Sequence, residues 1–172
     1  MRHQDADVIG ELAQKATLAL FSGYGLDLTP ASHTPPDSGL VAVIGFTSPE
    51  LRGAMALLLS EDVVRATHTI HAHPSEAERR DWAGELANQL LGRVKNLLIA
   101  WGPVVSMSTP MVVSGNALSL GGRFLSTRTA CWSSAAGPLQ VTFEMEGAPT
   151  LQLSAPLDDA PEVEEEGACL LF

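Results

Sequence analysis

Residues 75–101 carry the longest uninterrupted helical pattern in the sequence. Ser75 can cap the first turn, and Glu78, three residues further on, completes a capping box. Gly102 and Pro103 are expected to stop the helix at its other end. At about 1.5 Å per residue the segment would run for roughly 40 Å, which is long enough to cross a small domain. The rest of the fold must therefore be arranged around this helix.

Two stripes of side chains run along the predicted helix. The apolar stripe recurs at three- and four-residue steps and is expected to be buried. It consists of Trp82 or Ala83, Leu86, Leu90, Val94, Leu97 and Trp101. The polar stripe consists of Asp81, Glu85, Asn88 and Gly92, with Gly84 beside it. A glycine inside a helix costs about 1 kcal/mol relative to alanine, so the two glycines suggest that another surface comes close to this face.

The polar stripe also has an ordinary explanation. A glutamate and an asparagine on the exposed side of an amphipathic helix are usually only solvated. The glycines can serve the packing of the helix instead of the approach of a partner. Spacing alone leaves both interpretations open.

The polar stripe resembles the signature of a known family. Residues 81–88, D-W-A-G-E-L-A-N, followed by Gly92 and Pro110, are similar to the Asp/Ser-x3-Glu-x2-Asn…Pro signature of the CheC/CheX/FliY group of chemotaxis phosphatases. Residues 45–62, G-F-T-S-P-E-L-R-G-A-M-A-L-L-L-S-E-D, resemble the glycine-bearing apolar hairpin that precedes the signature helix in that group. Pro110 lies about one residue closer to the asparagine than in the family pattern. Because the signature occurs once, the chain most resembles the single-motif, CheX-like branch.

The resemblance implies a protein phosphatase that hydrolyses the aspartyl phosphate of a CheY-like response-regulator receiver domain. Carried onto this sequence, Asn88 would position the attacking water and Glu85 would anchor the lysine of the receiver. Asp81, Gly84 and Gly92 would lie at the contact with this partner. A neutral amide can position a water without repelling the phosphoryl oxygens, and phosphoryl transfer depends mainly on positioning and charge neutralisation. The receiver would supply Mg²⁺, so the resemblance implies no cofactor and no metal of the chain's own.

Two other functions stay open. Flagellar switch components resemble this family in fold without needing the Glu/Asn pair, so the chain could be a noncatalytic adaptor that binds a signalling partner. His68, His71 and His73 form an H-x-x-H-x-H cluster that could hold a transition metal. No cysteine lies near them, and the helix dipole favours a histidine at a helix C-terminus anyway, which makes a metal the weaker interpretation.

The remaining segments predict a mixed α and β (α+β) fold. Helical patterns cover residues 5–22 and 61–71. Apolar runs between turn residues predict strands at residues 40–47, 51–59, 104–113, 117–128, 139–146 and 151–156. We expect the first two strands to form a hairpin, and the next two to pair through a turn at residues 114–116. The predicted architecture is a largely antiparallel sheet of about six strands with about three helices packed on it, which is CheX/CheC-like.

The length of 172 residues predicts one domain, residues 1–157, followed by an acidic and flexible tail, residues 158–172. The formal net charge of -10 argues against nucleic-acid binding. The sequence indicates neither a signal peptide nor a membrane span and holds only two cysteines, so we expect a cytoplasmic protein. Members of the CheX-like branch pair as homodimers, and the resemblance therefore implies a homodimer that serves chemotaxis or another two-component signalling pathway.

Overall fold

An antiparallel sheet of seven strands lies at the centre of the computed structural model, which describes residues 1–32, 38–71, 73–116 and 126–153. The strand order is β1-β6-β7-β3-β2-β4, and β5 also pairs with β2. The strands are β1 (Thr29–Pro30), β2 (Ser38–Thr47), β3 (Leu51–Ser60), β4 (Ser106–Met107), β5 (Met111–Asn116), β6 (Ser126–Ser134) and β7 (Gly137–Gly147). Together with three helices among the described residues, this sheet confirms the predicted α+β class.

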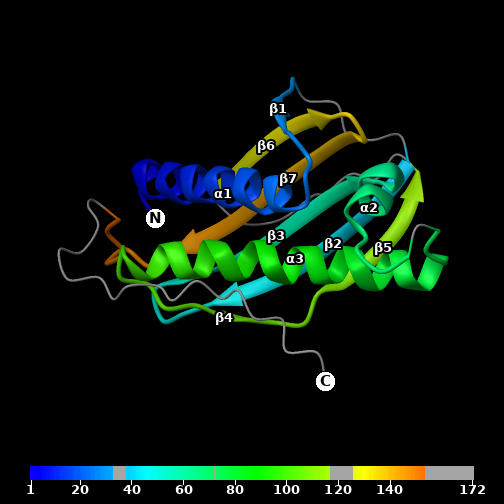
Figure 1. The fold of residues 1–172 in the computed structure, drawn as a ribbon. Coiled ribbons are helices and arrows are strands. Elements are labelled where there is room, and N and C mark those ends of the chain that lie inside the picture. The colour runs from blue at the N-terminus through cyan, green and yellow to red at the C-terminus, as the bar shows by residue number, and fades with distance from the viewer. Residues whose placement is uncertain (33–37, 72, 117–125, 154–172) are drawn as a thin grey trace.

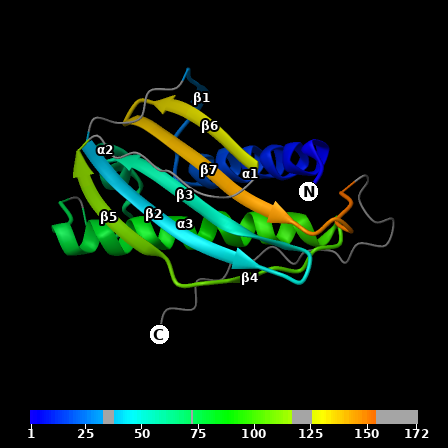
Figure 2. The same ribbon diagram turned by 180° about the vertical axis from the view of Figure 1, so that it is seen from behind.

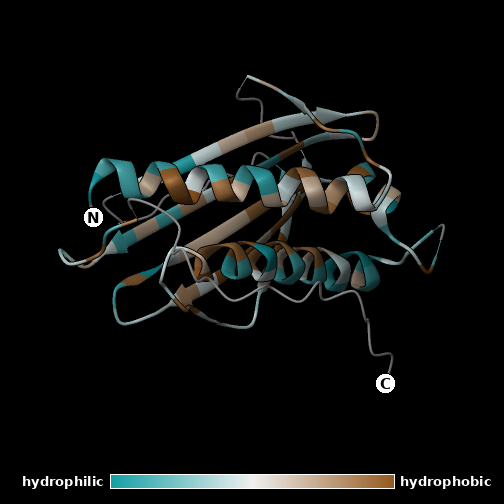
Figure 3. Ribbon diagram, turned by 60° about the vertical axis from the view of Figure 1, so that its left-hand side comes forward, coloured by the Kyte–Doolittle hydropathy of each residue, from teal (hydrophilic) through white to brown (hydrophobic). Residues whose placement is uncertain are grey.

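The helices are α1 (His3–Gly23), α2 (Glu61–Thr67) and α3 (Glu76–Ile99). The two long helices, α1 and α3, lie side by side on one face of the sheet (Figure 1). From behind, the strands lie in front of both helices (Figure 2). Hydrophilic and hydrophobic residues alternate along α1 and α3, as expected of amphipathic helices (Figure 3). Helix α2 ends four residues before the predicted bound, because His68 already has an extended backbone.

Helix α3 begins at the predicted capping box. Ser75 Oγ accepts a hydrogen bond from the Glu78 N–H at 3.3 Å, and Glu78 Oε2 accepts one from the Ser75 N–H at 2.7 Å. The helix ends at Ile99, two residues before the predicted bound. Because both end signals are local in sequence, the helix that carries the polar stripe could be located closely from the sequence.

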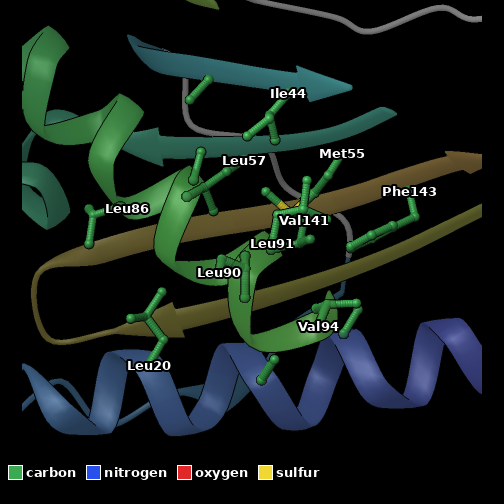
Figure 4. Close-up of a cluster of buried hydrophobic side chains, with 14 of the residues drawn as sticks. Leu20, Ile44, Met55, Leu57, Leu86, Leu90, Leu91, Val94, Val141 and Phe143 are labelled. Carbon is green, nitrogen blue, oxygen red and sulfur yellow. The ribbon is translucent and has the colours of Figure 1, made fainter. Parts of the chain in front are cut away.

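The apolar stripe of α3 packs onto the sheet. Leu86, Leu90 and Val94 are fully buried, whereas Trp82, Leu97 and Trp101 are half-buried against the same core. Figure 4 shows the α3 side chains pointing toward residues of the sheet, with Leu20 of α1 beside them. The sheet residues labelled there are Ile44, Met55, Leu57, Val141 and Phe143. Each buried leucine contributes about 1.5–3 kcal/mol, so this face fixes the orientation of the helix and turns the polar stripe away from the sheet.

Strands β2 and β3 form the predicted hairpin and lie under α3, with Val43 opposite Ala56. Gly53 lies where the backbone of the neighbouring strand β7 comes very close. A Cβ at this position would overlap the carbonyl oxygen of Glu144 and lie 2.7 Å from Phe46 Cζ. A side chain at residue 53 would therefore push β7 away from β3 and open the centre of the sheet.

The turn predicted at residues 114–116 is wrong. Of the strand expected to pair through it, residues 117–128, only residues 126–128 are described, and they pair with β7. Strand β5 pairs with β2, where Ser114 lies opposite Leu40, and β6 pairs with β7. The residues expected to form a turn, 114–116, are the last three residues of β5. The local Ser-Gly-Asn turn signal is overridden because β2 offers a strand edge along which these residues continue the ladder.

Other predicted segments lie partly or wholly outside the described residues. Residues 117–125 of the fourth predicted strand belong to this group, and so do residues 154–156 of the last one. Leu151 and Leu153 are buried, but they are not part of a strand. The boundary at residue 157 and the acidic tail, residues 158–172, also lie outside the described residues, so the domain division stays a prediction.

Candidate functional site

The polar stripe occupies the side of α3 that faces away from the sheet. Asp81 and Glu85 are exposed, and Asn88 and Gly92 are half-buried. Their spacing places them one above another along about three turns of the helix. A carboxylate and a carboxamide are thus presented together from a rigid element that is anchored by its opposite face.

The hydrogen-bonding groups of the Asn88 side chain are not used by the described residues. Within the part of the chain that the structure describes, it forms no hydrogen bond, and the same is true of the Asp81 carboxylate. A carboxamide carries two N–H donors and a carbonyl acceptor. The Asn88 side chain can therefore bind a water molecule or a group of a partner without breaking an internal contact.

Glu85 is held by a neighbour that sequence reasoning missed. Its Oε1 atom accepts a hydrogen bond from Gln89 Nε2 at 2.9 Å, and Gln89 Oε1 accepts one from the Tyr24 hydroxyl at 2.8 Å. The spacing of four residues between Glu85 and Gln89 could have indicated the first contact. Tyr24 lies at the end of α1, 65 residues before Gln89 in the sequence, and no local pattern points to it.

The two glycines beside the stripe differ in their surroundings. Gly84 is buried, and a Cβ there would lie 3.5 Å from Pro110 Cγ and 3.5 Å from Val112 Cγ2. At Gly92 no other atom would lie within 4 Å of such a Cβ. The segment that contains Val112 and Pro110, the proline of the signature, therefore comes close to α3 at Gly84. Around Gly92 the surface is open.

The charged groups at the start of α3 are paired. Hydrogen bonds from Ser75, together with the nearby His71, lower the pKa of Glu78 to about 2. Its Oε1 lies 2.6 Å from His71 Nδ1. The Arg80 guanidinium donates to Glu76 Oε1 at 2.7 Å and to Ser114 Oγ at 2.8 Å. One turn further along, Asp81 and Glu85 carry negative charge without an ion pair to the described residues, so this part of the stripe suits a cationic group of a partner.

The histidine cluster does not assemble as a ligand set. The rings of His68 and His71 stack with centroids 5.9 Å apart, and His68 Nδ1 accepts a hydrogen bond from the His71 backbone N–H. His73 is exposed. Among the residues whose structure is described, no group of three or more His, Cys, Asp or Glu side chains could hold a metal ion.

The fold and the polar stripe together define an α+β domain that presents an acid and an amide on an open helix surface. The family described as chemotaxis phosphatase CheX matches residues 40–128, just over half of the chain, and the chain belongs to this family. The matched region contains most of β2 and all of β3 and α3, including Glu85 and Asn88. No curated protein matches the sequence.

Three solved structures illustrate the likeness of fold. The chemotaxis protein CheX from Vibrio vulnificus has 23% identity and a TM-score of 0.69, covering 78% of this chain and 93% of that one. A CheC-like superfamily protein from Shewanella sp. PV-4 has 23% identity and a TM-score of 0.71, with coverage of 81% and 97%. A CheX-CheY-BeF3-Mg²⁺ complex from Borrelia burgdorferi has 12% identity and a TM-score of 0.63, with coverage of 79% and 96%. At these identities the likeness establishes the fold.

None of the helices in the described residues has both the length and the apolar character that a membrane span requires. This holds for α3 as well, although it is the longest of them at 24 residues.

Proposed function

We propose that the protein hydrolyses the aspartyl phosphate of a CheY-like receiver domain, with Asn88 positioning the attacking water and Glu85 pairing with the lysine of the receiver. The observation that carries this proposal is that α3 presents the Asn88 amide, which forms no hydrogen bond to the described residues, three residues after the exposed Glu85 carboxylate on the same open face. Membership of the chemotaxis phosphatase family supports it. The solved complex of a CheX with a CheY supports the class of partner.

The chemistry suits these two side chains. The oxygen of the water attacks phosphorus while the bond from phosphorus to the aspartate oxygen breaks, which releases inorganic phosphate and the free carboxylate. Asn88 accepts a hydrogen bond from the water or donates one to it, and so holds it in line with the breaking bond. A carboxylate at residue 88 would repel the phosphoryl oxygens, whereas a neutral amide does not.

Glu85 acts on the positive charge of the receiver's lysine, whereas Asn88 acts at the phosphoryl group. Its carboxylate forms an ion pair with the receiver's lysine and so orients the two proteins. Mg²⁺ belongs to the receiver in this proposal, and the chain contributes no cofactor. The negative charge of Asp81 and Glu85 favours the approach of the cationic lysine.

The shape of the site also favours a protein substrate. A phosphoaspartate is part of the partner's own surface, so the groups that reach it must project from an accessible element. Helix α3 is one of the two long helices that cover one face of the sheet (Figure 1), and the space beside Gly92 allows another backbone to come close.

The proposal has further parts. Asp81, Gly84 and Gly92 border the contact with the receiver, and Gly84 does so through Pro110, which lies against it. The phosphatase domain comprises residues 1–157, with residues 158–172 as a tail outside the catalytic unit. The protein is a cytoplasmic hydrolase, acts as a homodimer and serves chemotaxis or another two-component pathway.

The test is hydrolysis of phosphorylated receivers from the same cell by the purified protein. We expect Asn88→Ala to lower kcat about 100-fold while binding is largely retained. Glu85→Ala should raise KM about tenfold with a smaller change in kcat. Asn96→Ala, two turns beyond Gln89 on a half-buried part of α3, is the matched control and should behave as the wild type.

Two outcomes would contradict the proposal. If Asn88→Ala hydrolysed the receiver phosphate at the wild-type rate, the water-positioning role would be lost. If the wild-type protein bound phosphorylated receivers without accelerating the loss of phosphate, the alternative of a noncatalytic adaptor on the same fold would hold instead.

A further inference from the structure

We propose that Gln89 and Tyr24 are positioning residues of the phosphatase site and hold the Glu85 carboxylate ready for the receiver's lysine. This inference rests on the function proposed above. It concerns the relay of two hydrogen bonds that runs from the Tyr24 hydroxyl through the Gln89 carboxamide to Glu85 Oε1.

The direction of both hydrogen bonds follows from the chemistry of the groups. An ionised carboxylate can only accept, so the Gln89 amide must turn its N–H toward Glu85. Its carbonyl oxygen then faces Tyr24, and the tyrosine hydroxyl donates to it at 2.8 Å. The reversed amide would place the Gln89 oxygen against the carboxylate. The relay therefore has one satisfied arrangement and selects a single orientation of the Gln89 side chain.

Tyr24, at the start of the relay, packs against the hydrophobic core. The Tyr24 ring packs edge to face on the Trp82 ring, with centroids 5.7 Å apart and an interplanar angle of 81°. The Trp82 indole N–H donates to Thr67 Oγ1 at 3.1 Å, and Thr67 is buried. A chain of contacts thus leads from Thr67 of α2 through Trp82 of α3 and Tyr24, the C-cap of α1, to Gln89, which holds the exposed Glu85.

This arrangement has two consequences for the site. First, Glu85 loses less side-chain freedom when it pairs with the lysine, because one of its oxygens is already held. Its Oε2 atom accepts no hydrogen bond from the described residues and stays available for the ammonium group. Second, the hydrogen bonds through Gln89 hold the Glu85 carboxylate on the side of α3 that faces Tyr24. Pro110 and Val112 lie near α3 at Gly84.

The kinetic test compares Gln89→Leu and Tyr24→Phe with the wild type. Leucine removes the carboxamide at similar volume, and phenylalanine removes only the hydroxyl while the ring contact with Trp82 is kept. We expect each variant to raise KM for the phosphorylated receiver about fivefold and to leave kcat within about twofold. Asn96→Leu is the matched control on α3, and thermal unfolding checks that every variant is folded. Unchanged KM values in folded Gln89→Leu and Tyr24→Phe would overturn the proposal.

A double variant separates positioning from an independent contact. In a Glu85→Ala background, Gln89→Leu should raise KM no further, because the group that it positions is gone. If Gln89→Leu raised KM equally in both backgrounds, Gln89 would act directly on the receiver and the relay proposal would be wrong.

A measurement on the protein alone keeps this proposal distinct from the phosphatase function. The NMR signals of the Gln89 side-chain amide should shift in both Glu85→Ala and Tyr24→Phe, but not in Asn96→Leu. Should the wild type hydrolyse no receiver phosphate, the proposed function fails, and these signals alone decide the relay: shifts support it and unchanged signals overturn it. An active wild type with a kinetically normal Gln89→Leu variant overturns the relay and leaves the function intact.

Discussion

Two carboxylates on the two long helices, Asp5 near the start of α1 and Glu85 in the middle of α3, have opposite surroundings. Asp5 is fully buried, and its two oxygens accept four hydrogen bonds: three from Arg2 and one from the Leu153 backbone N–H. Glu85 is exposed and accepts one hydrogen bond, from Gln89. An acid whose bonding capacity is filled internally stabilises the fold, whereas an acid with a remaining oxygen can serve a partner.

The protonation of Asp5 follows from these contacts. Burial alone would raise the pKa of Asp5, but the hydrogen bonds from the Arg2 side chain and from the Leu153 and Arg2 backbones outweigh burial and lower the pKa. Asp5 therefore stays ionised in the interior and ties the start of α1 to residue 153. No local pattern in the sequence points to this contact, because its two ends are 148 residues apart.

The largest expected effect on stability comes from Asp5→Ala. Removing the carboxylate leaves the Leu153 N–H buried without its partner and breaks the contacts to Arg2, so we expect a loss of about 3 kcal/mol in the free energy of unfolding. The measurement is urea denaturation at neutral pH. Asp7→Ala is the matched control, because Asp7 is half exposed and pairs with Arg128 at the surface, and it should lose less than about 1 kcal/mol. Equal losses of unfolding free energy in Asp5→Ala and Asp7→Ala would show that the buried Asp5 contributes no more to stability than a surface acid.

Glu85→Ala should behave in the opposite way. We expect its free energy of unfolding to stay within about 0.5 kcal/mol of the wild type, since the side chain is exposed and forms one surface contact. Its effect should appear in KM for the receiver, about tenfold, which corresponds to about 1.4 kcal/mol. Denaturation and kinetics on the same preparation check both halves. A Glu85→Ala variant that was strongly destabilised would show that the acid belongs to the fold rather than to a partner site.

The two glycines of α3 allow a finer comparison on a single helix. Gly84→Ala and Gly92→Ala should each stabilise the free protein by up to about 1 kcal/mol, because alanine favours the helix and neither new Cβ meets an atom closer than 3.5 Å. For docking we expect a difference. Gly92→Ala adds a methyl group to open surface and should raise KM about threefold, while Gly84→Ala adds one beneath Pro110 and should change KM less. The reverse order in KM would place the partner contact at Gly84.

The smallest expected effect is on the pH dependence of stability. The pKa of Glu78 is lowered from 4.5 to about 2, chiefly by hydrogen bonds from Ser75. Its contribution to stability is therefore complete above about pH 4.5 and is lost as the pH falls toward about 2. Glu78→Gln should flatten the stability curve in this window. His71→Ala should retain most of the curve, because His71 is the lesser cause, and a flat curve in His71→Ala would reverse that ranking.

The helices and the exposed position of the polar stripe on α3 could be predicted from the sequence because their signals are local. Ser75 and Glu78 define one end of α3, and the three- and four-residue periodicity identifies its buried face. Apart from the β2–β3 hairpin, strand pairing could not be predicted in the same way. Residues 114–116 have a good turn composition, yet they extend along β2, because long-range pairing outweighs a turn preference of a few residues. The same limit applies to Tyr24, whose contact with Gln89 joins two helices that are distant in sequence.

Strand β7 lies between β6 and β3, with Leu51 opposite Gly147. The middle of the sheet therefore cannot close until residues 137–147 have left the ribosome, and closing it requires a large loop to form first. A nascent chain that has emerged only as far as α3 would expose one edge of β3, within an apolar hairpin, to other chains. Synthesis of this protein should consequently be sensitive to the supply of chaperones, and slow translation of the last third of the chain should favour aggregation.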